Sequence, residues 1–156
     1  MAGEEVQLVV FTLQSGSSVC EYGVPISQVR EINRLTAPTR LPQAPSFVEG
    51  VINLRGKVIP VIDLKKRFEL EAGEYTDNTR IIVVDIAGHT VGIVVDEVTE
   101  VLRIPAENVE PPPSIISGVT AEYLKGVGKV GDRLLVLLDL RQILSSSETK
   151  QLDHIA

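Results

Sequence analysis

Short apolar stretches recur along the chain, and in many of them apolar and polar residues alternate at every second position. This alternation is typical of β-strands, because successive side chains point to opposite faces of a strand. Gly, Pro, Asn or Asp residues separate the stretches, as expected of tight turns. The pattern predicts strands over residues 6–13, 19–24, 31–35, 48–54, 57–64, 80–86, 90–96, 98–104, 123–130 and 133–138.

Helical segments are predicted to be few and short. Pro25 favours a helical turn over residues 25–29, because proline fits the first turn of a helix. Two further short helices are predicted at residues 64–68 and 140–144, and Asp139 is a suitable N-cap for the second. About ten short strands without a long helix indicate an all-β fold, built as one barrel or as a pair of small barrels.

The composition supports strands and a substantial interior. Val and Ile, whose branched Cβ suits a pleated surface, account for 22 and 14 of the 156 residues. With 44% hydrophobic residues the chain can bury a large core, which excludes intrinsic disorder. Its longest apolar runs fall far short of the roughly 20 residues that span a bilayer. We therefore expect a soluble cytoplasmic protein without membrane insertion, in which the single cysteine, Cys20, is buried and inert.

The charge balance argues against a nucleic-acid partner. The formal net charge is −6, and neither half of the chain carries the basic excess that phosphate neutralisation needs. A small-barrel nucleic-acid binder is the competing class, but it would need aromatic side chains that stack on a basic face. Aromatic residues make up only 4% of the chain, so this class is disfavoured.

Catalytic and metal-binding chemistry find little support in the sequence. The two histidines, His89 and His154, are far apart, and with one cysteine they cannot supply the clustered ligands of a zinc site. Asp96 and Glu97 are neighbours on a predicted strand, so they point to opposite faces and do not form an acid–base pair. Four aspartates each follow an apolar strand, where turn capping is the favoured role: Asp63, Asp85, Asp96 and Asp139. We predict no catalytic residue, no metal and no cofactor.

One apparent nucleotide-binding motif is rejected on its context. Residues Gly126–Gly131 have the spacing G-x-G-x-x-G. A dinucleotide fingerprint needs these glycines between a strand and a helix. Here a strand-like run, residues 134–138, follows the last glycine, so Gly131 is predicted to form a hairpin turn.

The densest signal is the segment FVEGVINLRGKVIPVIDL, residues 47–64. It resembles the signature of the CheW family of bacterial chemotaxis coupling proteins. The resemblance extends upstream through residues 22–24 and 29–32, and downstream through residues 91–98, 123–126 and 135–144. Nearly the whole chain from Val6 to Leu144 fits the family in order and length.

The resemblance implies two five-stranded SH3-like barrels that share a hydrophobic core, with short helices that include one near the C-terminus. It implies one intertwined domain over residues 1–148, and residues 149–156 are predicted to be a flexible tail. Members of the family have no enzymatic activity. They couple the cytoplasmic tips of chemoreceptors (methyl-accepting chemotaxis proteins) to the regulatory domain of the histidine kinase CheA, in receptor arrays at the membrane.

The resemblance also implies site residues. Glu31 and Arg55 occupy the family's acidic and basic positions near the receptor groove, and we predict that they pair; the alternative is an exposed ion pair without a binding role. Asn53 and Gly56 are predicted to be structural residues of the turn, with Asn53 bonded to backbone. The candidate receptor-binding residues are Val29, Glu31, Gly50, Arg55, Val98 and Val101, with core packing as the alternative for the valines and a backbone bend or close approach for Gly50.

Overall fold

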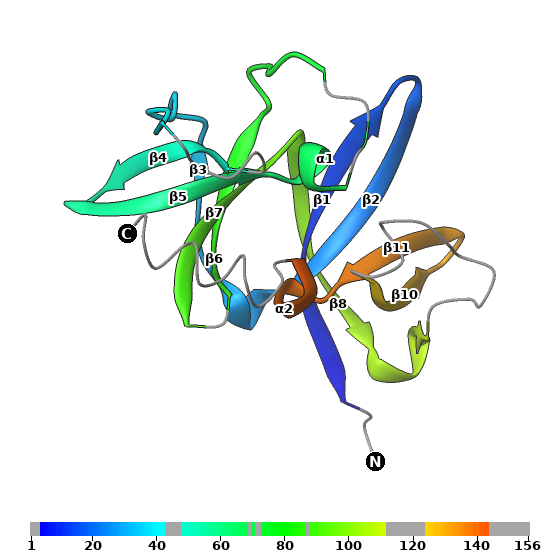
Figure 1. The fold of residues 1–156 in the computed structure, drawn as a ribbon. Helices are drawn as coiled ribbons and strands as arrows, with labels where there is room; N and C mark the ends of the chain where they lie inside the picture. Colours follow the sequence, from blue (N-terminus) through cyan, green and yellow to red (C-terminus); the bar gives the residue numbers. More distant parts are fainter. Residues whose placement is uncertain are drawn as a thin grey trace.

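The computed structural model describes residues 4–42, 48–68, 70, 73–86, 88–111 and 124–143. Two β-sheets dominate this part of the chain, and the helices between the strands are short (Figure 1). The prediction of an all-β fold with two subdomains and short helices is confirmed. The predicted tail, residues 149–156, lies outside the described residues.

The first sheet, here called the terminal lobe, takes strands from both ends of the described chain. Its strands follow the order β8-β1-β2-β11-β10-β9. They are antiparallel neighbours, except that β11 runs parallel to β2. Their bounds are β1 Glu5–Ser15, β2 Ser18–Pro25, β8 Glu97–Pro105, β9 Val109–Glu110, β10 Leu124–Val130 and β11 Arg133–Leu138.

The second sheet, here called the central lobe, is built from the middle of the chain. Its strands follow the order β3-β6-β7-β5-β4, and only β5 and β7 are parallel neighbours. The strands are β3 Val29–Arg34, β4 Val48–Leu54, β5 Lys57–Asp63, β6 Arg80–Ile86 and β7 His89–Val95. Three short helical segments lie between strands, the 3₁₀ turns η1 Ile26–Gln28 and η2 Ala106–Asn108 and the helix α1 Leu64–Arg67, and a fourth, the helix α2 Leu140–Ile143, follows β11.

The terminal lobe differs from the predicted five-stranded barrel by one strand. The two-residue strand β9 pairs with β10 through Val109 and Glu110, in a stretch where the sequence pattern predicts no strand. The turn η2 connects β8 to β9 and so directly precedes this pairing. In the central lobe a single bridge between Thr39 and Val51 takes the corresponding place beside β4. The named strands of neither sheet form a closed ring within the described residues.

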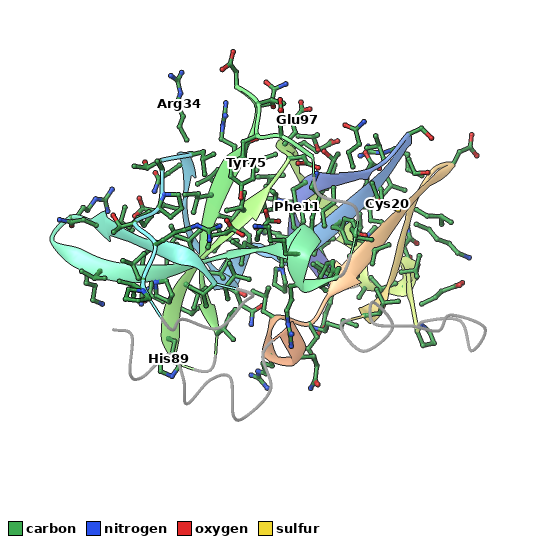
Figure 2. The ribbon with its side chains drawn as sticks, turned by 45° about the horizontal axis from the view of Figure 1, so that its top comes forward. Phe11, Cys20, Arg34, Tyr75, His89 and Glu97 are labelled. Atoms are coloured by element: carbon green, nitrogen blue, oxygen red, sulfur yellow. The ribbon has the colours of Figure 1, made fainter. Side chains whose placement is uncertain are left out.

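Three hydrophobic clusters account for the core, and single strands contribute to two of them. In β1, Val9 and Phe11 belong to the cluster shared by the lobes, whereas Leu8 and Val10 face the interior of the terminal lobe. Strand β6 alternates likewise between the shared cluster and the interior of the central lobe. Phe11 stacks on Tyr22 at a centroid distance of 5.7 Å and lies where the two lobes meet (Figure 2). Because both faces of these strands are buried, the two lobes form one continuous core.

The prediction that Cys20 is buried is wrong. Cys20 is exposed in β2, on the outer side of the terminal lobe (Figure 2). It pairs with Leu13 close to the tip of the β1–β2 hairpin, and its neighbour Val19 is 59% exposed. The shared core covers β2 only farther along, where Tyr22 and Val24 are buried.

Each lobe contains the same unit, a hairpin followed by a helical turn. In the β4–β5 hairpin the register shifts beside Gly50, and in the β10–β11 hairpin it shifts beside Gly126. Both hairpins end at an aspartate that caps the next helix. Asp63 Oδ1 accepts the N–H of Lys65 at 2.9 Å, and Asp139 Oδ1 accepts the N–H of Arg141 at 3.0 Å. The capping role predicted for these two aspartates is confirmed.

Candidate functional site

A groove of about 280 Å³ opens at one end of the central lobe. Its lining contains three basic side chains and one acidic side chain, in a protein whose net charge is −6. The groove therefore presents local positive charge to a partner. It is lined by Arg30, Glu31, Leu54, Arg55, Gly56, Lys57, Ile59, Val83 and Thr90.

The turn between β4 and β5 places Arg55 at the rim of this groove. Arg55 has φ 53° and Gly56 has φ 85°, as in a type I′ hairpin turn. A side chain in this left-handed region costs roughly 1–2 kcal/mol, and Arg55 is the one non-glycine among the described residues that adopts it. Asn53 Oδ1 accepts the N–H of Gly56 at 2.8 Å, which stabilises the turn. Asn53 thus bonds to the backbone of the turn, and Gly56 lies in the turn with positive φ.

Glu31 connects β3 to this turn. Arg55 Nη1 lies 3.1 Å from Glu31 Oε2, so the predicted pairing is confirmed. Asn33 Nδ2 donates to the other carboxylate oxygen, Oε1, at 2.8 Å. The Glu31 side chain is 21% exposed and that of Arg55 is 81% exposed. The carboxylate is thus held from two sides, while most of the guanidinium remains available to a partner.

A second ion pair lies on the same side of the central lobe. Arg30 Nε donates to Asp85 Oδ1 at 2.8 Å, and Thr90 Oγ1 lies 3.4 Å from the same oxygen. The Asp85 carboxylate thus holds side chains of both neighbouring strands, and its predicted capping role stays a prediction. The register of β3 against β6 shifts between Val29 and Glu31, so Arg30 is an extra residue that reaches Asp85 on the neighbouring strand.

The structure does not bring the other candidate residues into the groove. Gly50 has φ 153°, and a Cβ there would collide with the carbonyl oxygen of Thr39, so the predicted close backbone approach is confirmed. Val29 and Val98 pack against the shared core, which is the packing alternative. Val101 is 54% exposed on β8, opposite Val9.

Sequence reasoning does not reveal a buried polar network at the junction of the lobes. The Lys65 side chain is 7% exposed, and its Nζ lies 3.1 Å from both Asp96 Oδ2 and the carbonyl oxygen of Gln14. Asp96 Oδ2 also accepts the N–H of Gln14 at 2.6 Å. The capping role predicted for Asp96 is wrong, because its carboxylate instead connects α1 to β1 across the two lobes. This network borders a hollow of about 510 Å³ between them.

Two tyrosines beside the core are harder to ionise than usual. Burial, and then the charge of nearby Cys20, raise the pKa of Tyr22 to about 12. Tyr75 donates from its hydroxyl to Asp63 Oδ2 at 2.9 Å. Burial and then this carboxylate raise the pKa of Tyr75 as well. Both hydroxyls remain protonated at neutral pH.

The corresponding end of the terminal lobe is spanned by an ion network. Arg133 Nη2 lies 2.9 Å from Glu21 Oε1 and 2.9 Å from Glu100 Oε2. Hydrogen bonds to Glu21 and then to Glu100 raise the pKa of the Arg133 guanidinium. One arginine here holds two glutamates from different strands, whereas Arg55 holds one.

Neither a cluster of metal-binding side chains nor a membrane-spanning helix is found among the described residues. No group of three or more His, Cys, Asp or Glu side chains in the described ranges could hold a metal ion. Among the helices of that part of the chain, none is long and apolar enough to cross a membrane.

Comparisons with known proteins identify relatives over nearly the full chain. The sequence model of the CheW-like domain matches residues 7–148. The chain is 40% identical to the chemotaxis protein CheW of Klebsiella aerogenes, over 100% of this chain and 93% of that protein. It is 36% identical to the chemotaxis protein CheW of Bacillus subtilis, over 83% of each. The crystal structure of the scaffolding protein TtCheW from Thermoanaerobacter tengcongensis superimposes with a TM-score of 0.82 at 36% identity, covering 93% of this chain and 96% of that one.

Proposed function

The chain belongs to the CheW-like family, and from this premise we propose that it is a non-enzymatic chemotaxis adaptor that couples chemoreceptors to the histidine kinase CheA. The observation that carries the proposal is the family match over residues 7–148, together with relatives that are named chemotaxis proteins. In this role the protein works in the cytoplasm at membrane-associated receptor arrays. Its work is to hold two partners together, without a cofactor.

The groove of the central lobe supports a contact with the receptor tip. Arg55 is tethered to Glu31 at one end, yet most of its guanidinium is exposed. Arginine in such a position can form a bidentate pair with a partner's carboxylate. We assign the receptor contact in the groove to Arg55 and Glu31, with Gly50 shaping the strand that carries the turn, and we assign a second contact to the exposed Val101 on β8 of the terminal lobe. In this assignment Val29 and Val98 do not touch the receptor. They pack against the shared core beneath the binding surface.

The test is reconstitution of receptor cytoplasmic fragments, CheA and this protein, with kinase autophosphorylation as the readout. We expect Arg55→Glu to reduce receptor-dependent kinase control about tenfold, because it puts like charges beside Glu31 and on the partner face. Glu31→Arg combined with Arg55→Glu should restore part of the coupling. Lys129→Glu is the matched control, since Lys129 forms an exposed ion pair with Glu110 on the other lobe.

Two results would contradict different parts of the proposal. If the wild-type protein couples no receptor fragment to CheA, the adaptor function is wrong. If Arg55→Glu and the single variant Glu31→Arg each couple normally, the adaptor function stands and the assignment of the groove is wrong. Circular dichroism of each variant checks that the fold is retained.

A further inference from the structure

Strand β5 meets its parallel neighbour β7 over only half of its length. The ladder pairs Val61 with Gly92 and continues to Asp63 and Val94. In the terminal lobe the equivalent ladder begins one residue earlier, where Val136 pairs with Tyr22. Pro60 occupies the place of Val136, since each is the fourth residue of the second hairpin strand. Because proline has no N–H to donate, the ladder of the central lobe cannot continue past Val61.

The main-chain groups of β5 before this point face away from β4. Val51 exchanges its N–H and C=O with Thr39 at 2.9 and 2.8 Å, so it is not hydrogen-bonded to its cross-strand partner Pro60. Hydrogen-bonded and non-hydrogen-bonded pairs alternate in an antiparallel ladder. The pair two residues along, Asn53 and Val58, is therefore also non-hydrogen-bonded. The N–H and C=O of Val58 point to the β7 side of the strand.

The main chain of β7 faces this side in the same way. His89 and Ile86 pair across a two-residue turn, which makes them a hydrogen-bonded pair. The next pair, Thr90 and Asp85, is then non-hydrogen-bonded, so the N–H and C=O of Thr90 point toward β5. Since the β5–β7 ladder begins only at Val61 and Gly92, and Pro60 has no N–H, the carbonyl of Thr90 lacks the donor that the next rung of the ladder would supply.

That space is a hollow of about 150 Å³, here called the β5–β7 gap. It shares Lys57, Ile59 and Thr90 with the neighbouring groove, so the two adjoin. Its rim is apolar where the Val58 side chain is 49% exposed. It is lined by Lys57, Val58, Ile59, Pro60, Gly88, His89 and Thr90, and His89 lies at the tip of the central lobe (Figure 2).

We propose that the β5–β7 gap accepts an extended acidic segment of the CheA regulatory domain, which pairs with the main chain of Val58 or Thr90. Addition of a strand to such an edge uses main-chain hydrogen bonds for affinity and side chains for specificity. The gap lining contains Lys57 and no acidic residue. Lys57 forms no ion pair with a described residue, and Arg55 stands beside it in the groove. This inference rests on the proposed function and adds the chemistry by which the kinase is held.

The experiment is calorimetric titration of the full chain with the CheA regulatory domain. Val58→Pro removes a donor that points into the gap and leaves the β4–β5 ladder its hydrogen bonds; we expect affinity to fall about three- to tenfold. Leu134→Pro is the matched control, because Leu134 has the equivalent place in β11 and is 62% exposed. Lys57→Glu should weaken binding and abolish its sensitivity to salt.

A second variant covers the case in which Val58→Pro fails to fold. Pro60→Val restores the donor that lets β5 close on β7, so it should retain or raise stability and weaken kinase binding by a similar factor. In the wild-type complex, amide exchange at Val58 or Thr90 should slow at least tenfold, as expected for a newly hydrogen-bonded amide.

The outcomes separate the two proposals. If the wild-type protein does not bind the regulatory domain, the kinase part of the proposed function fails and the gap assignment fails with it. If Val58→Pro and Pro60→Val bind as the wild type does, only the gap assignment is overturned. A concentration-dependent dimer that Val58→Pro abolishes would identify a second copy of this chain as the occupant and would also overturn it.

Discussion

The β4–β5–α1 unit of the central lobe and the β10–β11–α2 unit of the terminal lobe share a plan but differ at their edges. Both have a glycine at a register shift and an aspartate cap. In the terminal lobe, Val136 extends the parallel ladder and Arg133 bridges two glutamates. In the central lobe, Pro60 ends the ladder and Arg55 stays 81% exposed. The change at one equivalent place, Pro60 for Val136, thus ends the parallel ladder of the central lobe, and the different placing of the two arginines leaves Arg55 open to partners.

The largest difference between the two units is expected at their glycines. A Cβ at Gly50 would collide with the Thr39 carbonyl, at a φ of 153° that side chains rarely adopt. At Gly126 the Cβ would lie 2.7 Å from the Glu110 carbonyl oxygen, without that unfavourable φ. We expect Gly50→Ala to lower the free energy of unfolding by about 3–5 kcal/mol and Gly126→Ala by about 1–3 kcal/mol. Urea denaturation followed by circular dichroism measures both.

Gly56→Ala separates the two causes of instability at Gly50, the steric overlap of the added Cβ and the unfavourable φ. Gly56 has φ 85°, but a Cβ added there would meet no atom within 4 Å beyond its chain neighbours, so only the backbone cost of about 1 kcal/mol is expected. All three variants should unfold in one transition, because the lobes share a core. Equal losses for Gly50→Ala and Gly126→Ala, or two separate transitions, would contradict this account.

An intermediate effect is expected at the second residue of each helix. Lys65 is buried in the network at the lobe junction, whereas Arg141, in the equivalent place of α2, is exposed. Lys65→Met leaves the Asp96 carboxylate and the Gln14 carbonyl without their cation, so we expect a loss of about 1–3 kcal/mol in unfolding free energy. Arg141→Met should stay within about 0.5 kcal/mol. Thermal denaturation of the pair measures this, and equal losses would show that Lys65 does not hold the lobes together.

The smallest effect is expected at alkaline pH, where the two tyrosines ionise. The pKa of Tyr22 in the folded protein is about 12, above its ordinary value of 10.0. The folded state therefore holds the Tyr22 proton more strongly than the unfolded state does. The contribution of this proton to the free energy of unfolding is complete below pH 10 and is lost as the pH rises through 12. We expect Tyr22→Phe to flatten the fall in stability over this window. Tyr75→Phe tests the central lobe in the same way, and an unchanged slope in both variants would contradict the pKa shifts.

The strands are predictable because their burial is regular. Strands β6 and β11 coincide with the predicted residues 80–86 and 133–138, where nearly every position is apolar or alternates. The two-residue β9 is not predictable, since a pairing this short carries no periodic signal and depends on the turn before it. The exposure of Cys20 is equally hidden from the sequence, because it depends on how far the other lobe covers the hairpin.

The candidate site is predictable only in part. The Glu31–Arg55 pair follows from the family resemblance, whereas Asn33, which holds the second oxygen of Glu31, carries no signal of its own. Lys65 and Asp96 are of types that are usually exposed, and their contact joins positions far apart in the chain. Pro60 shows in the sequence that a strand ladder must end there. The sequence does not show which strand lies on that side of β5, because only the fold brings β7 beside it.

The strands of the terminal lobe come from two parts of the chain that the central lobe separates. Strands β1 and β2 are followed by the whole central lobe before β8 arrives to pair with β1, and β11 reaches β2 later still (Figure 1). During synthesis the first hairpin therefore leaves the ribosome with both outer edges unpaired, whereas the central lobe already has all five of its strands by Val95. The lobe that is made first in sequence is thus the last that can be completed.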